Sequence, residues 1–199
     1  MRYVFLRRGR IEVVSTYKYL AVIFDDFLEF DAGVKALAGG AGRGLGKIFS
    51  THKRLHGMGY KTFTTMYEGM VDPIILYGAG VWGLKRFGCT EAVQNRAQRI
   101  FLGVHKYACN EAVNGDMGWR TVATKQKIWV LRLWNHLCEM EENRLCKKVF
   151  NIDHGAKKGW ASGVKKLGTG SLLKIKRPCQ SGSVGKFWTW RTKSSGNLM

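Results

Sequence analysis

The spacing of apolar residues changes near residue 30, and this change constrains the fold more than any other feature. Beyond that point apolar side chains recur every three or four residues, as on the buried side of a helix. Before it, three short runs rich in β-branched and aromatic residues have the composition of strands: residues 3–6, 11–14 and 17–24. The sequence therefore predicts a mainly α protein of the α+β class. A small antiparallel β-meander occupies residues 1–30 and a helical region occupies residues 31–153.

The predicted meander is too small to be stable by itself. Three short strands with one covered face form a marginal sheet in water. We therefore expect this sheet to need a neighbour that the chain does not supply, which is a first indication that the sequence is a fragment.

The first helical segment lies within residues 34–56 and has two contrasting faces. At about 100° per residue, one side of this segment is apolar, and the opposite side carries Arg43, Lys47 and Arg54. The residues on the apolar side are Leu45, Ile48, Phe49, His52, Leu55 and His56. Five glycines between residues 39 and 46 each cost up to ~1 kcal/mol in a helix interior. The composition predicts a frayed or broken first half and a regular helix over residues 45–55.

Further helices are predicted over residues 61–71, 91–102 and 122–150. Thr90 has the side chain of a good N-cap for the second of these, with Glu91 in its first turn. Three glutamates near residue 140 interrupt the last segment and indicate a turn or an exposed face.

Net charge narrows the class of partner. The chain has 33 Lys and Arg against 14 Asp and Glu, a formal charge of +19. Self-repulsion of this size is relieved by a polyanion, so nucleic acid is the favoured partner, ahead of an anionic membrane surface. Residues 154–199 carry ten of the basic residues and no acidic one, and their Gly, Ser and Lys content predicts a basic, partly disordered tail.

Cysteines and apolar runs indicate the compartment. The five cysteines are scattered and form no C-x-x-C pair, so they suit neither a disulfide framework nor a structural zinc site. No metal and no cofactor is expected, and an intracellular, reducing location in the nucleus or cytoplasm fits best. The longest apolar passage, residues 70–82, contains Asp72 and Pro73 and is too short for a bilayer, so we expect no membrane partner.

Asp25 and Asp26 look at first like the paired aspartates of a polymerase. Metal-assisted phosphoryl transfer needs carboxylates that converge from separate strands, and the only acidic residue before this pair is Glu12. We therefore predict a solvated strand end and no catalytic residue. An active polymerase fragment that uses Asp25 and Asp26 is the alternative.

Basic residues that stand beside aromatic ones, or together on a helix face, are the candidate contacts with nucleic acid. They are Tyr17, Lys18 and Tyr19 among the strands, Arg43, Lys47 and Arg54 on the first helix, Arg96 and Arg99 one helical turn apart, and the Lys/Trp/Arg run at residues 186–191. Solvated cations and ordinary core aromatics would explain any one of them alone. Together with the charge of +19, they favour binding.

An ordered series of short segments resembles the reverse transcriptases of non-LTR (LINE-type) retrotransposons. VSTYKYLAVIFD at residues 14–25 is similar to the strand after the catalytic palm motifs of that family, where Tyr-Leu-Gly-Val is usual. Segments similar to the thumb and post-thumb follow in the family's order: residues 66–71, PIILYG at 73–78, VWG at 81–83, VQNRAQRIFLGV at 93–104, LRLWNH at 131–136 and KKVF at 147–150.

The resemblance implies roles for two regions. Residues 17–22, including Leu20, correspond to the primer grip, and residues 34–72 to thumb helices that hold the template–primer duplex. Ala21 stands where the family has glycine. The palm, with its catalytic aspartates, and the fingers would lie before Met1.

The expected protein is thus a truncated reverse-transcriptase-like (RNA-directed DNA polymerase) fragment of a retrotransposon, with a helical bundle of thumb type. It would be non-catalytic alone and would bind RNA or DNA without sequence preference. The alternative is a decayed interaction module that binds no nucleic acid.

Overall fold

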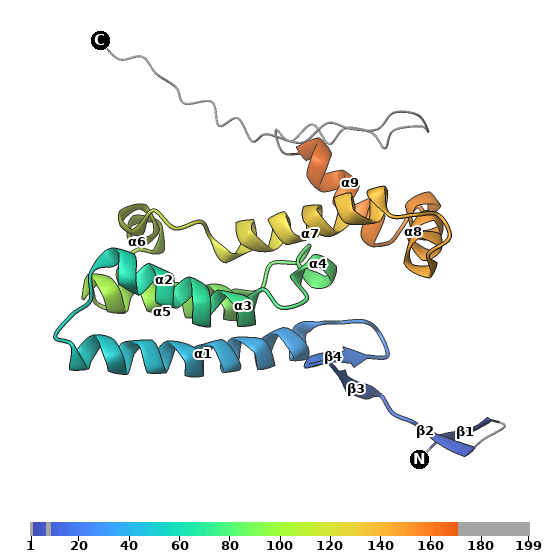
Figure 1. The fold of residues 1–199 in the computed structure, drawn as a ribbon, viewed down its shortest axis with the longest axis horizontal. Helices are drawn as coiled ribbons and strands as arrows, with labels where there is room; N and C mark the ends of the chain where they lie inside the picture. The colour runs from blue at the N-terminus through green and yellow to red at the C-terminus, as the bar shows by residue number, and fades with distance from the viewer. Residues whose placement is uncertain (1, 7–8, 171–199) are drawn as a thin grey trace, which may run out of the picture.

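The computed structural model describes residues 2–6 and 9–170, which form a layered, mainly helical structure with two small hairpins (Figure 1). In Figure 1, α1 lies along one side, α2, α3 and α5 pack on it, and α7 lies across them with α8 and α9 at its far end. The elements are β1 (Arg2–Leu6), β2 (Gly9–Val13), β3 (Thr16–Tyr19), β4 (Val22–Asp25), α1 (Asp31–Arg54), α2 (Tyr60–Met70), α3 (Asp72–Ile75), α4 (Ala79–Trp82), α5 (Gly88–Leu102), α6 (Asn110–Met117), α7 (Val122–Glu139), α8 (Leu145–Gly155) and α9 (Trp160–Gly170).

The N-terminal strands form two separate antiparallel hairpins, β1–β2 and β3–β4, and the predicted three-stranded meander is wrong. In the second hairpin Tyr19 pairs with Val22, so Leu20 and Ala21 form the turn. Both turn residues have positive φ, 45° and 67°. The expected strand over residues 17–24 is therefore a hairpin. Its turn has neither Asn nor Gly, the residues that usually mark such a turn in a sequence.

Helix α1 is continuous over 24 residues, so the predicted break in its first half is wrong. Close packing explains why the glycines are tolerated. A Cβ on Gly44 would lie 3.3 Å from the backbone oxygen of Met70, and one on Gly40 would lie 3.5 Å from Ile74 Cγ2. These glycines let α1 lie directly against α2 and α3, where Ala41, Leu45 and Ile48 are buried. Tertiary packing of this kind outweighs low intrinsic helix propensity.

Three alanine substitutions in α1 test this account. Gly42 and Gly46 have open space where a Cβ would be placed, so Gly42→Ala and Gly46→Ala should each raise the free energy of unfolding by about 0.5–1 kcal/mol. Gly44→Ala should lose most or all of this gain, because the added methyl group meets the Met70 carbonyl. Urea unfolding followed by circular dichroism measures all three. Equal stabilisation by the three variants would contradict the close packing at Gly44.

Three of the described helices, α3, α4 and α6, are not among the predicted ones, and the others differ from the prediction mainly at their ends. Helix α2 covers the predicted residues to within one position. Helix α5 begins at Gly88, and Thr90 is buried within it, where its Oγ1 donates to the Phe87 carbonyl at 2.8 Å. Thr90 is therefore not the N-cap. The predicted segment 122–150 consists of two helices, α7 and α8, which are separated at the glutamates. The turn predicted near residue 140 is therefore confirmed.

The core of the described residues consists of three clusters of buried apolar side chains. The first joins α1, α2, α3 and α5 and contains Leu45, Ile48, Phe63, Tyr67 and Ile75. The second joins α7, α8 and α9 around Trp134, and the third surrounds Trp82. None of the described helices has the combined length and apolarity needed to cross a membrane.

Helix α9 lies in the segment that the sequence assigned to the basic tail. Ala161 and Val164 are fully buried against Trp134 and its neighbours, and Trp160 Nε1 donates to the Gly80 carbonyl at 3.1 Å. Asp153 Oδ2 accepts the Ala161 N–H at 2.8 Å at the start of the helix. The tail assignment is therefore wrong for residues 160–170, while residues 171–199, with the run at 186–191, lie outside the described residues.

Lys147 stabilises the end of α7 from within the second cluster. Its side chain is 8% exposed, and its Nζ donates to the carbonyls of Leu137 at 3.1 Å and Cys138 at 2.9 Å. Lys147→Met keeps the length of the side chain but removes both hydrogen bonds and the ion pair with the exposed Glu142, whose Oε1 lies 3.6 Å from Nζ. We expect the free energy of unfolding to fall by about 2–3 kcal/mol. Lys148→Met, at the adjacent exposed lysine, should change it by less than about 0.5 kcal/mol. Similar losses in the two variants, measured by urea unfolding, would contradict this role.

Candidate nucleic-acid interface

The β3–β4 hairpin presents two aromatic side chains to solvent. Tyr17 and Tyr19 are 61% and 56% exposed, the turn residue Leu20 is 68% exposed, and Lys18 is also exposed. Strand β4 contacts α1, and a Cβ on Gly33 would lie 3.2 Å from the Ile23 carbonyl oxygen. The hairpin is thus fixed at the N-terminal end of α1, with both tyrosines free to contact a ligand.

Arg43, Lys47 and Arg54 lie on the outer side of α1 and are all exposed. Their spacings of four and seven residues place them in one stripe that is about 16 Å long, at 1.5 Å per residue. Within the part of the chain that the structure describes, none of the three forms an ion pair with a carboxylate. We call these three residues the α1 cationic stripe.

The two arginines of α5 have different environments. Arg96 is exposed, whereas Arg99 is partly buried and its Nη2 donates to the Ala108 carbonyl at 2.9 Å and to Asn110 Oδ1 at 2.5 Å. Arg99 therefore holds the connection between α5 and α6. Its Nη2 is already bonded to two protein acceptors, and its buried Nε has no partner among the described residues. The one-turn spacing in the sequence does not show these contacts.

The candidate residues do not form one continuous surface. The hairpin lies at the start of α1 and Arg54 at its end, which are about 35 Å apart in a 24-residue helix. Arg43 and Lys47, one turn apart, lie between them. A ligand that contacted both the tyrosines and the α1 cationic stripe would have to be extended, like a nucleic-acid strand or duplex.

Asp25 has a structural role in the turn that follows β4. Its Oδ1 accepts the backbone N–H groups of Phe27 at 3.1 Å and Glu29 at 2.7 Å. Asp26 is exposed. Among the described residues, no three His, Cys, Asp or Glu side chains lie close enough together to hold a metal ion.

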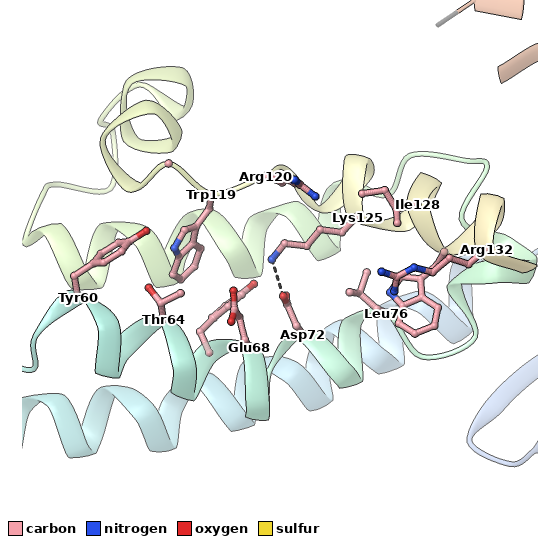
Figure 2. A pocket seen from close by; sticks show the side chains of 13 residues that line it. Tyr60, Thr64, Glu68, Asp72, Leu76, Trp119, Arg120, Lys125, Ile128 and Arg132 are labelled. Carbon is pink, nitrogen blue, oxygen red and sulfur yellow. Dashed lines mark hydrogen bonds and ion pairs between the residues drawn. The ribbon is translucent and has the colours of Figure 1, made fainter. Parts of the chain in front are cut away.

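A groove that the sequence analysis did not identify runs between α2–α3 and the start of α7 (Figure 2). Its cavity is about 520 Å³ in volume. In Figure 2, Trp119, Lys125 and Arg132 reach from one wall toward the facing helices. The opposite wall carries Thr64, Glu68, Asp72 and Leu76.

An ion pair at the floor of the groove joins the two walls. Lys125 Nζ lies 2.6 Å from Asp72 Oδ2, and both side chains are largely buried. The ammonium also lies 5.3 Å from the ring centre of Tyr67 and 5.8 Å from that of Trp119, within the range of cation–π attraction. Burial raises the pKa of Asp72 above its ordinary value, although the Lys125 charge opposes this shift. Burial, with the nearby Asp72, also raises the pKa of Tyr67, so its hydroxyl stays protonated at neutral pH.

A second, more apolar cavity of about 720 Å³ continues the groove along α4. The two cavities share Asp72, Trp129 and Arg132 among their lining residues. Trp129 is 42% exposed, and the Arg132 guanidinium lies 5.1 Å from its ring centre.

The sequence contained a local signal for one wall of this groove. Trp119, Arg120, Lys125, Trp129 and Arg132 alternate aromatic and basic residues, the same pattern that selected the hairpin. The opposite wall comes from residues about 50 positions earlier, which no local pattern links to them.

No protein-family model, curated protein or solved structure matches this chain in the comparisons.

Proposed function

We propose that this chain is a non-catalytic, reverse-transcriptase-like unit that binds RNA or DNA without sequence preference. In this proposal α1, α2 and α5 form a bundle of thumb type, and the β3–β4 hairpin takes the place of a primer grip. The observation that carries the proposal is the α1 cationic stripe: three exposed cations on one helix face, unpaired within the described residues, in a chain of net charge +19.

The chemistry of these contacts accounts for binding that does not depend on sequence. Arginine and lysine contact phosphate oxygens, which every nucleotide carries, and exposed tyrosines can stack on any base. An extended ligand could contact the tyrosines at one end of α1 and the cations farther along the helix.

The test is a titration of the full chain with fluorescently labelled single-stranded RNA and with an RNA–DNA duplex, across salt concentrations from 50 to 300 mM. We expect binding to both, with log K falling linearly as log salt rises and little difference between unrelated sequences. No binding, or binding without a salt slope, would refute the proposal and favour an interaction module that does not bind nucleic acid.

Absence of catalysis is a separate part of the proposal. It is supported by the use of Asp25 Oδ1 as an acceptor for two backbone N–H groups, which ties this carboxylate to its own turn. We expect no primer extension by the chain with Mg²⁺ and all four deoxynucleotides. Extension that is lost in Asp25→Asn or Asp26→Asn would establish the polymerase alternative.

A further inference from the structure

Four polar side-chain atoms along the groove between α2–α3 and α7 are buried without a hydrogen-bond partner among the described residues. They are Thr64 Oγ1, the Tyr67 hydroxyl, Asp72 Oδ1 and Trp119 Nε1. Tyr67 is fully buried, and its ring centre lies 4.5 Å from that of Trp119. Three further unpaired buried polar atoms among the described residues lie elsewhere: Gln94 Oε1, Gln98 Oε1 and Arg99 Nε. Each such group costs about 1–3 kcal/mol, so four of the seven at one cavity indicate a missing partner there.

The four atoms require a partner with both donors and acceptors. Asp72 Oδ1 can only accept while the carboxylate is ionised, because the group then carries no proton; Oδ2 already accepts from Lys125 Nζ. The Trp119 N–H can only donate, and the two hydroxyls can do either. A phosphodiester offers acceptors alone, and any phosphate anion would be repelled by Asp72 and Glu68. The edge of a nucleobase offers an amino or imino donor beside ring-nitrogen and carbonyl acceptors.

The rest of the groove suits the other parts of a nucleotide. The indoles of Trp119 and Trp129 line the groove and can stack on a base through a ring face that Tyr67 or Arg132 does not cover. Arg120 and Arg132 are exposed on the same wall and can contact a phosphate without entering the floor of the groove (Figure 2). A volume of about 520 Å³ lies within the usual range for small-ligand sites.

We propose that this groove binds one unpaired nucleotide of an RNA or DNA strand. The base stacks on the indoles, its edge bonds to Asp72 Oδ1 and to the Thr64 and Tyr67 hydroxyls, and its phosphate meets Arg120 and Arg132. This inference rests on the proposed function only in taking the nucleotide from a bound RNA or DNA strand. The groove itself is separate from the α1 cationic stripe.

Calorimetric titration of the full chain with four small probes tests the chemistry. Adenosine and cytidine 5′-monophosphate should bind saturably, because each base has an amino donor next to a ring-nitrogen acceptor. Ribose 5-phosphate and inorganic phosphate should bind at least tenfold more weakly. Equal binding of all four probes would show an anion site, and no saturable binding of the nucleotides would show that water alone fills the groove. Either result overturns the inference.

Tyr67→Phe separates a binding role from a structural one. The variant removes an unpaired hydroxyl and keeps the packed ring, so the free energy of unfolding should not fall. Affinity for adenosine monophosphate should fall about threefold to tenfold, the value of one hydrogen bond. Tyr107→Phe removes an exposed hydroxyl outside the groove and should change neither property. Unchanged nucleotide affinity in Tyr67→Phe would contradict the inference.

Trp129→Leu gives a second, independent test. Trp129 is partly exposed and lies outside the three core clusters, so its replacement should leave the chain folded. Loss of a stacking surface should lower nucleotide affinity about fivefold or more. If long strands bind with a salt slope but the mononucleotides do not, only this inference fails. If the mononucleotides bind but duplexes do not, only the proposed function of the stripe fails.

Discussion

Replacing Arg43, Lys47 and Arg54 together with glutamine is expected to lower affinity for an RNA–DNA duplex by about two orders of magnitude at 0.1 M salt. Each cation that contacts a phosphate releases counterions on binding, so its loss removes close to one unit from the slope of log K against log salt. The slope of the triple variant should therefore be smaller by about 2 to 3 units. All three side chains are exposed, so the fold should be retained.

A control with the same change in net charge is available elsewhere on the chain. Lys148, Lys157 and Lys158 are exposed residues near the second cluster, away from α1. Their triple replacement by glutamine should change the salt slope by less than 1 unit. Equal losses in the two variants would mean that overall charge binds nucleic acid, without a defined contribution from the α1 cationic stripe.

Gly83→Ala is expected to lower the free energy of unfolding by about 3 kcal/mol. Gly83 ends α4, at the place where this short helix packs closely on α7. An added Cβ would meet the carbonyl oxygen of Ala79 and would lie 3.1 Å from that of Gln126. Both neighbours are backbone atoms, so no side-chain rotation can relieve the contacts. The end of α4 would have to change its conformation to clear the Ala79 carbonyl, and α4 and α7 would have to separate to clear that of Gln126.

Gly115→Ala provides the matched control for Gly83→Ala. Gly115 lies inside α6 with open space where a Cβ would be placed, so the same substitution should stabilise the chain by up to about 1 kcal/mol. Urea unfolding measures both variants. A loss of less than 1 kcal/mol in Gly83→Ala would show that the α4–α7 contact is looser than its geometry indicates.

Local sequence patterns predicted most of the helices but not how glycine-rich segments behave. The spacing of Leu45 and Ile48 correctly predicts the buried side of α1, whereas Phe49 and Leu55, predicted for the same side, are 43% and 57% exposed. Intrinsic propensity is a local property, and it predicts a helix break at Gly40 and Gly44. In the structure these two glycines face other helices, and their missing side chains permit close packing.

The candidate nucleic-acid contacts likewise include some that local sequence patterns predict correctly and one that they do not. Exposure of Arg43, Lys47 and Arg54 followed from their position opposite the apolar face, and the structure has all three exposed. Arg99 satisfied the same local criterion, yet its guanidinium bonds to residues of the α5–α6 connection. These hydrogen bonds depend on the path of the chain after α5, and the spacing of basic residues along the helix does not predict that path.

The sequence by itself determined the helical class of the chain, the cationic side of α1 and the basic character that favours a polyanionic partner. These properties depend on residues within about one helical turn of each other or on composition. Only the tertiary structure decided that residues 17–24 form a hairpin, that residues 160–170 pack as a helix, and that Asp72 and Lys125 meet across a groove. The reason is physical: the groove joins residues 53 positions apart, and such contacts form only when the helices between them pack.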